Sequence, residues 1–273
     1  MEFNYFDIHS HLNFPDFDND REDMIKKMTE EKIGAICVGT DLKTSKECVE
    51  LASKHGNIWA TIGVHPNDSE EDFDEEKFKA LFESMPLSGG ATKLELNQSK
   101  IVGIGECGLD YFRMKSGDKS EKDKQIKNFE KQIQFAIQNN LPLMIHSREA
   151  YDDILGILNF YKKENLKLRG NIHFFVGDKD IAKKLFDIDF TISFSGVITF
   201  SNDYDQTIEY SPLDKIMADT DSPFVAPAPF RGKRNEPFYV KEIVKKIAEI
   251  KKQDLEKVKK QMVKNAIKQF MLL

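Results

Sequence analysis

Short runs of hydrophobic residues alternate along the chain with longer stretches in which hydrophobic positions recur at helical spacing. The runs have the length of buried strands, and the charged stretches between most of them are typical of surface helices. Strands are predicted at residues 3–8, 34–38, 58–64, 101–105, 142–146, 170–174, 190–194 and 215–219. Helices are predicted at residues 21–31, 45–55, 75–84, 121–139, 151–164 and 178–186, followed by a short stretch at 203–210 and a long, lysine-rich one at 237–271.

Strands that alternate with helices predict a parallel sheet with helical crossovers, and eight such units fit a closed barrel. We therefore expect an α/β protein with a (β/α)8 barrel of the TIM type. A doubly wound open sheet is the alternative, but it usually has a glycine-rich phosphate loop after its first strand, and no such loop follows Ile8. No linker divides the chain, so we expect one domain over residues 1–273, with a polar loop insertion at 89–100.

Composition limits the possible partners and location. The net charge of −6 argues against a broad basic surface for nucleic acid, although bound metal ions would still attract a substrate phosphate. The three cysteines (Cys37, Cys48 and Cys107) follow no disulfide or metal-binding pattern, which indicates reduced thiols. The chain shows neither a signal-peptide pattern nor an apolar run of membrane-spanning length. We expect a cytoplasmic monomer that does not associate with membranes.

Histidines gather at the predicted strand ends, where the active sites of parallel barrels lie. Five of the six histidines fall there: His9, His11, His65, His146 and His173. His9 and His11 are two residues apart, so both rings can face one point. Glu106 follows the fourth predicted strand, and Asp221 follows the eighth.

These residue types indicate a metal site, because neutral imidazole nitrogens and carboxylate oxygens bind divalent ions. Taken singly, each has a structural explanation, such as a hydrogen-bonded core histidine or a turn-forming aspartate. Their coincidence at separate strand ends favours ligands. Two ions about 3.5–4 Å apart and bridged by Glu106 would use the whole set. The predicted ligands are His9, His11, Glu106, His146, His173 and Asp221.

Segments that span nearly the whole chain resemble the TatD family of metal-dependent deoxyribonucleases, within the amidohydrolase-like barrel superfamily. They are residues 6–13, 63–66, 103–111, 142–148, 193–196, 219–223 and 231–237. The Gly-Glu-x-Gly-Leu-Asp segment at 105–110 and the Arg-Gly-x-Arg-Asn-Glu-Pro segment at 231–237 are the most specific. The resemblance implies a (β/α)8 barrel, divalent metal ions held by the same six residues and, in some members, 3′-to-5′ exonuclease activity on DNA.

The chain departs from the common family pattern beside the ligands but not at them. Asp219 stands where glutamate is frequent, and Asn67 stands where a second histidine often follows His-Pro. Phe174 follows His173 at a position where cysteine is frequent.

We expect four residues to take part in catalysis or to bind the substrate. Glu106 is the expected bridge, and Asp221 is expected to accept a proton as well as bind metal. His65 is expected to contact the substrate phosphate or act as an acid. Arg148 lies two residues after His146, and its guanidinium suits a phosphate, with a surface salt bridge as the alternative.

Residues in two loops are further candidates for contacts with substrate. Arg231 and Arg234, with Lys233 between them, would meet the nucleic-acid backbone or would order their loop through Glu236. Tyr111 and Phe112 would stack on a base or pack within their own loop.

We therefore expect a metal-dependent phosphodiesterase of the deoxyribonuclease type, with 3′-to-5′ exonuclease-like action on single-stranded DNA or 3′ ends. A metal-activated water would carry out hydrolysis, with two ions per chain that are zinc, magnesium or manganese. The alternative enzyme is an amidohydrolase-type C–N or ester hydrolase that acts on a small molecule. A non-enzymatic barrel stabilised by metal is a third possibility.

Overall fold

Eight parallel strands form one sheet in the order β1-β2-β3-β4-β5-β6-β7-β8, so each strand pairs with its neighbours in sequence. The structure is a computed structural model that describes residues 2–67, 72–84, 100–112, 114 and 119–272. The strands are β1 (Tyr5–Ser10), β2 (Ile33–Val38), β3 (Ile58–Ile62), β4 (Ile101–Asp110), β5 (Leu143–Arg148), β6 (Gly170–Ile172), β7 (Thr191–Phe194) and β8 (Ile216–Ala218).

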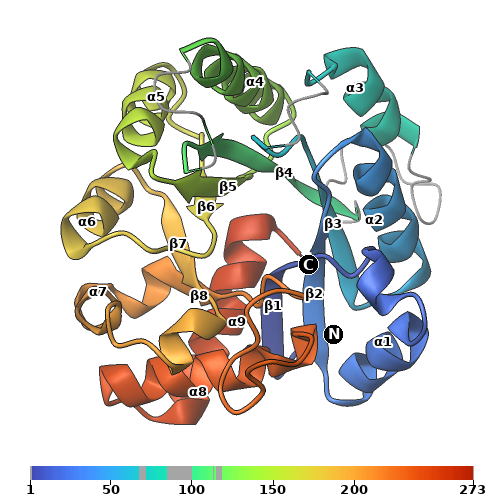
Figure 1. The fold of residues 1–273 in the computed structure, drawn as a ribbon, viewed down its shortest axis with the longest axis vertical. Coiled ribbons are helices and arrows are strands. Elements are labelled where there is room, and N and C mark those ends of the chain that lie inside the picture. The colour runs from blue at the N-terminus through green and yellow to red at the C-terminus, as the bar shows by residue number, and fades with distance from the viewer. Residues whose placement is uncertain (1, 68–71, 85–99, 113, 115–118, 273) are drawn as a thin grey trace.

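Helices surround this sheet on its outer face, except for the last one, which lies behind the barrel in the view of Figure 1. They are α1 (Arg21–Glu30), α2 (Leu42–Lys54), α3 (Glu75–Ser84), α4 (Lys119–Gln138), α5 (Tyr151–Glu164), α6 (Lys179–Asp187), α7 (Asp205–Tyr210), α8 (Val240–Lys251) and α9 (Leu255–Phe270). None of the helices in the described ranges is both long enough and apolar enough to cross a membrane.

The first strand and the segment after the last strand close the sheet into a barrel. Ser10 pairs with Ser222 in an isolated parallel bridge. The His11 N–H donates to the Ser222 carbonyl at 2.8 Å, and the Asp221 N–H donates to the His9 carbonyl at 3.0 Å. These contacts confirm the predicted (β/α)8 barrel and place Asp221 against β1.

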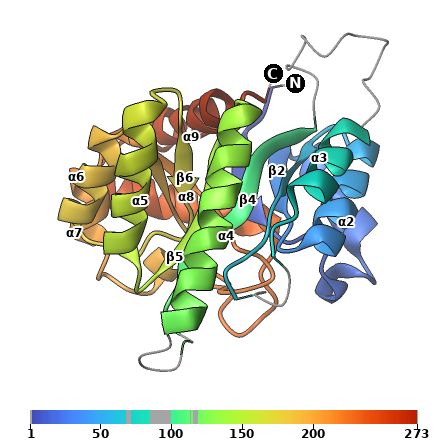
Figure 2. The same cartoon turned by 90° about the horizontal axis from the view of Figure 1, so that it is seen from above.

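The barrel interior is filled by large side chains at the N-terminal ends of the strands. Phe6, Trp59 and Met217 are buried there in one cluster, which also contains Val263 and Phe270 of α9. Figure 2 shows α9 at the end of the barrel where both chain termini lie. The C-terminal ends of the strands therefore meet at the opposite end of the barrel.

The largest differences between the observed element boundaries and the sequence prediction are at two places, and the others are of one to three residues. The lysine-rich stretch predicted as one helix at 237–271 contains two helices, because Lys252 adopts a left-handed conformation with φ of 52° and the Asp254 side chain caps α9 by accepting from the Lys257 N–H. Strand β4 continues to Asp110, five residues beyond its predicted end at residue 105. The loop insertion predicted at 89–100 lies outside the described residues, except for Lys100.

Candidate metal centre

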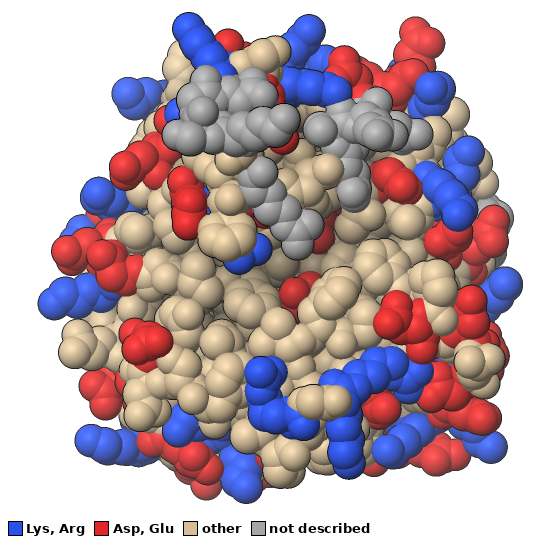
Figure 3. All heavy atoms as spheres, in the orientation of Figure 1, with Lys and Arg blue, Asp and Glu red and all other residues tan. Residues whose placement is uncertain are grey.

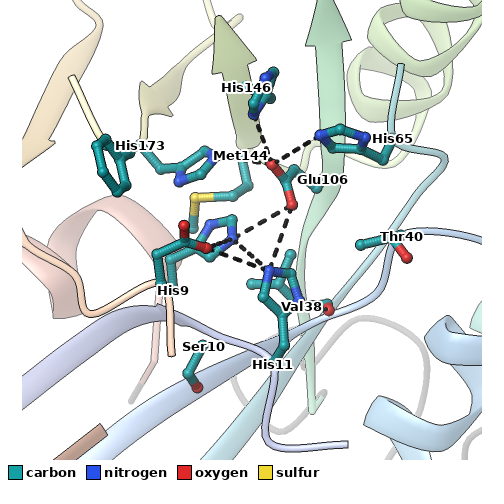
Figure 4. A network of polar contacts seen from close by, with 12 residues as sticks. His9, Ser10, His11, Val38, Thr40, His65, Glu106, Met144, His146 and His173 are labelled. Atoms are coloured by element: carbon teal, nitrogen blue, oxygen red, sulfur yellow. Dashed lines mark hydrogen bonds and ion pairs between the residues drawn. The ribbon is translucent and has the colours of Figure 1, made fainter. Parts of the chain in front are cut away.

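The predicted ligands come together at the C-terminal end of the barrel, around the carboxylate of Glu106 (Figure 4). On one side of it lie His9 and His11, whose Nε2 atoms are 3.3 Å apart. Glu106 Oε2 is 3.4 Å from His9 Nε2, and Asp221 Oδ1 is 3.4 Å from His11 Nε2. Atoms from β1, β4 and the segment after β8 therefore converge on one point.

The other oxygen of Glu106 faces a second pair of histidines. Glu106 Oε1 is 3.0 Å from His146 Nδ1 and 2.8 Å from His173 Nε2. Its two oxygens thus serve different histidine pairs, as a carboxylate that bridges two ions must do.

The donor set fits divalent metal ions. Glu106 and three of the histidines (His9, His11 and His173) are almost fully buried. Ligand atoms of His9, His11 and Glu106 lie within 4.8 Å of one another, as do those of His9, His173 and Asp221. His9 Nδ1 and His173 Nδ1 are buried without a hydrogen-bond partner. Mixed nitrogen and oxygen donors of this kind suit zinc or manganese better than magnesium.

The electrostatics of the site favour positive charge between the carboxylates. Burial opposes protonation of His11, but its hydrogen bond with Asp221 and the charge of Glu106 prevail and raise the pKa of His11 to about 9. Burial likewise opposes protonation of His146, yet Asp110 and Glu106 raise its pKa to about 9. Burial would raise the pKa of Glu106, but the surrounding histidines hold it well below its usual range. A cation would meet the same field.

Two other histidines are held neutral. Burial, together with the neighbouring His173, lowers the pKa of His9 to about 4. Burial lowers the pKa of His65 to about 3, against the opposing charge of Glu106. A neutral imidazole keeps a lone pair, which is the form that a metal ligand needs.

An irregularity in β4 aims Glu106 into the barrel. Ile104 pairs with Leu143, but the next register pair is Cys107 with Ile145, so β4 has one extra residue at Gly105-Glu106. A Cβ on Gly105, which has φ of 150°, would lie 2.3 Å from the Met144 carbonyl oxygen. Glycine is therefore required for this close approach, and the bulge redirects the side chain that follows it.

Asp110 is a site residue to which the sequence analysis gave no role. Its Oδ2 accepts from His146 Nε2 at 3.1 Å and from Asn67 Nδ2 at 2.8 Å. The first contact fixes the ring orientation of a predicted ligand, and the second explains what Asn67 does at a position where histidine is frequent. Asp110 belongs to the Gly-Leu-Asp part of the segment at 105–110, which is a sequence signal that could have identified it.

Two more buried aspartates, Asp7 and Asp219, lie two residues before the predicted ligands His9 and Asp221. Asp7 accepts from the Thr220 N–H at 2.8 Å and from its hydroxyl at 2.6 Å, and burial raises the pKa of Asp7 well above its usual range. Asp219 accepts from the Ser193 hydroxyl and from the Phe174 N–H at 3.1 Å. The shorter side chain of Asp219 is therefore still anchored in the strand layer beneath the ligands.

His65 lies against the same carboxylate as the predicted ligands. Its Nε2 is 3.4 Å from Glu106 Oε1, and its ring centroid is 4.5 Å from that of His146. The Asn67 N–H donates to His65 Nδ1 at 3.1 Å. In the neutral ring the proton is therefore on Nε2, which makes this atom a donor that points into the site.

The three arginines predicted to bind substrate have different surroundings. The Arg148 guanidinium lies 3.6 Å from the centroid of the Phe112 ring, and that of Arg231 lies 3.9 Å from the Phe200 ring. Arg234 instead donates to both Asp20 carboxylate oxygens, at 2.8 and 2.6 Å, and also approaches Glu236. The contacts of Arg234 favour the loop-ordering alternative over a substrate contact.

The barrel end that carries the site is hollowed (Figure 3). An acidic side chain shows within the hollow, and lysine or arginine side chains lie along one margin of it. A substrate that enters along this margin would therefore meet cationic groups before it reaches the histidines and carboxylates.

Comparisons with known proteins identify the family of the chain. The family model described as TatD related DNase matches residues 6–271. The uncharacterized metal-dependent hydrolase YabD of Bacillus subtilis is 38% identical over 97% of this chain and 98% of its own length. The corresponding protein MG009 of Mycoplasma genitalium is 36% identical, with the same coverage of the two chains.

A solved structure shows the same fold. The TatD homolog YjjV of Escherichia coli aligns with a TM-score of 0.86 at 22% identity and covers 100% of both chains. The chain therefore belongs to the TatD related DNase family of metal-dependent hydrolases.

Proposed function

We propose that the protein is a deoxyribonuclease that shortens single-stranded DNA from its 3′ end. One observation carries the proposal: Glu106 places its two oxygens against two separate histidine pairs, at 2.8–3.7 Å, at the open end of a barrel. The family to which the chain belongs adds the expectation of DNA as substrate.

Six residues would hold two divalent ions. We assign His9, His11 and Asp221 to one ion, His146 and His173 to the other, and Glu106 to both, because these are the contacts among their side chains. When bound, such ions polarise a phosphodiester and lower the pKa of water towards about 7.

The chain's own residues then position the substrate and move a proton. Burial would raise the pKa of Asp221, but its hydrogen bond with His11 and the nearby histidines lower it. Asp221 is therefore ionised at neutral pH and is suited to accept a proton from the attacking water. His65 Nε2–H would donate a hydrogen bond to a phosphate oxygen, because Nδ1 already accepts from the Asn67 N–H.

Arg148 and Arg231 would bind phosphates farther from the reacting bond. Both guanidiniums lie over phenylalanine rings. Arg231 Nη1 also donates to the Ala226 carbonyl at 3.2 Å, so the other N–H groups of Arg231 would donate to phosphate oxygens, as would those of Arg148. Arg234, tied to Asp20, is assigned to loop order instead.

A substrate panel tests the proposal. Metal-depleted protein receives zinc, manganese or magnesium, and each form is offered a 5′-labelled single-stranded oligonucleotide, its blunt duplex, a dihydropyrimidine and a lactone. We expect stepwise shortening of the single strand with at least one ion. Hydrolysis of the dihydropyrimidine or the lactone, with both oligonucleotides left intact, would instead identify an amidohydrolase-type enzyme.

A further inference from the structure

Exposed phenylalanine rings gather in the loops around the proposed metal centre. Among the described residues seven large hydrophobic side chains are exposed, and three of them are phenylalanines in loops that follow strand ends: Phe112 after β4, Phe200 after β7 and Phe224 after β8. We infer that Phe112 and Phe224 are base-stacking platforms on either side of the metal centre, and that they bind bases of an unpaired strand. This inference rests on the proposed function and names how its substrate is held.

The first platform consists of Phe112 and Arg148. The Phe112 ring is 54% exposed, and the Arg148 guanidinium covers one of its faces at 3.6 Å. The Phe112 N–H donates to Asp110 Oδ1 at 3.0 Å, while the other oxygen of Asp110 holds His146. One carboxylate thus fixes both the platform and a metal ligand, so the distance between them is set by the fold.

The second platform is Phe224, which is 48% exposed. Its ring centroid lies 6.2 Å from that of His11 and 6.2 Å from that of Phe14. Phe14 is itself stacked on His11, with centroids 4.6 Å apart. The Phe224 N–H donates to the Asp221 carbonyl at 2.9 Å. Phe224 is therefore anchored beside His11 and Asp221, whereas Phe112 is anchored beside His146.

The two platforms serve different ends of the site. His11 belongs to the histidine pair that faces Glu106 Oε2, and His146 belongs to the pair that faces Glu106 Oε1. A phosphodiester bound to the two proposed ions beside Glu106 has a nucleoside on each side of it. Each nucleoside would therefore have a phenylalanine ring within its reach.

Nucleobases match these platforms better than a protein partner does. Every base presents a flat face that stacks on an aromatic ring, whatever its identity. A guanidinium beside the ring supplies charge for the adjacent phosphate. Phe200 repeats the combination, with Arg231 3.9 Å from its ring. Although the net charge of the chain is −6, arginine on two exposed rings supplies local positive charge for a nucleic-acid strand.

Phe112→Leu and Phe224→Leu test the inference, because leucine keeps apolar bulk and removes the flat face. Phe160→Leu is the matched control, since Phe160 is 57% exposed but lies on α5. The steady-state constants kcat and KM are measured on an oligonucleotide and on the same oligonucleotide with abasic sites at its two 3′-terminal positions. Thermal unfolding checks that all variants are folded.

We expect each platform variant to raise KM on the normal oligonucleotide by about 5-fold to 150-fold, the range that one stacked base contributes. The kcat should change less than KM, and Phe160→Leu should match the wild type. Abasic sites should raise KM for the wild type but have much less effect on the variants. Equal KM values for normal and abasic strands with the wild-type enzyme would overturn the inference, as would wild-type constants for both variants.

A binding assay separates this inference from the proposed function. Fluorescence anisotropy measures the affinity of the same proteins for a labelled single strand, whether or not it is cleaved. If the wild type binds the strand without cleaving it and the platform variants bind it more weakly, the result supports the stacking inference and contradicts the nuclease proposal. If the wild type does not bind the strand, or binds a blunt duplex equally well, the platforms are refuted.

Discussion

Both ring nitrogens of His146 face a carboxylate, and this explains why Asp110 belongs to the site. His146 Nδ1 is 3.0 Å from Glu106, and Nε2 is 3.1 Å from Asp110. A carboxylate that accepts a hydrogen bond from the outer nitrogen fixes the tautomer of a ligating histidine. It also makes the inner nitrogen a stronger electron-pair donor to the metal. Asp110 would act in this way as a positioning residue.

We predict that Asp110→Asn weakens metal binding by about 10-fold to 100-fold, the usual effect of losing such a partner. Calorimetric titration of metal-depleted protein with zinc or manganese measures the change. Asp189→Asn is the control, because Asp189 is an exposed partner of Lys215 and its loss should leave metal affinity unaltered. Unchanged affinity in Asp110→Asn would remove Asp110 from the site.

Substitutions of Arg231 and Arg234 should show that Arg231 binds substrate and that Arg234 stabilises the fold. Arg234 joins the loop after β8 to Asp20, just before α1, with bonds to both carboxylate oxygens. We predict that Arg234→Ala lowers the free energy of unfolding by up to about 1 kcal/mol, as expected for a partly exposed ion pair. Arg231→Ala should leave that free energy within about 0.5 kcal/mol of the wild type.

DNA binding should show the opposite pattern. The logarithm of the DNA-binding constant falls linearly with the logarithm of the salt concentration. Arg231→Ala should reduce the slope of this line by about one unit, because one phosphate contact is lost. Urea unfolding and anisotropy at several salt concentrations measure the two quantities. An unstable Arg231→Ala, together with an Arg234→Ala that shows the altered salt slope, would reverse the assignment.

At the scale of elements, α9 closes the N-terminal end of the barrel with side chains that enter the interior cluster. Phe270 is almost fully buried there, together with Val263 and residues of several strands. We predict that Phe270→Ala lowers the free energy of unfolding by about 3–5 kcal/mol, the usual result of emptying a buried aromatic site. Urea unfolding tests this, with Phe160→Ala on the exposed face of α5 as the control. Similar values for the two variants would show that α9 does not plug the barrel.

The elements also show what the sequence could and could not predict. Hydrophobic runs located all eight strands, because strands that are buried on both faces are short and continuously apolar. The end of β4 was placed too early, since Glu106 and Asp110 interrupt its apolar pattern inside the barrel. The break between α8 and α9 was missed, although Asp254 is a residue type that often begins helices.

At the scale of the whole molecule, the predicted ligands are distant in sequence and meet only because the barrel closes. Strand order therefore made it predictable that these residues come together, once a (β/α)8 barrel was expected. Contacts between loops were not predictable in this way. The pairing of Arg234 with Asp20 spans 214 residues, and no local pattern marks it.

Bound metal should stabilise the whole fold, because the proposed ligands come from strands all around the barrel. We predict that chelation lowers the Tm of the wild type, since free metal at 100 times its Kd contributes about 2.7 kcal/mol. Differential scanning calorimetry with and without chelator measures this effect. Asp221→Ala should show a smaller shift, and an equal shift in both proteins would place the metal elsewhere.

The most direct measurement is cleavage of a 5′-labelled single-stranded oligonucleotide by wild-type protein and by Glu106→Ala, with circular dichroism to confirm that both are folded. We predict metal-dependent, stepwise shortening of the strand by the wild type and no detectable shortening by Glu106→Ala, because Glu106 is the one side chain shared by both proposed metal positions. Shortening at the wild-type rate by folded Glu106→Ala would contradict the bridged metal centre.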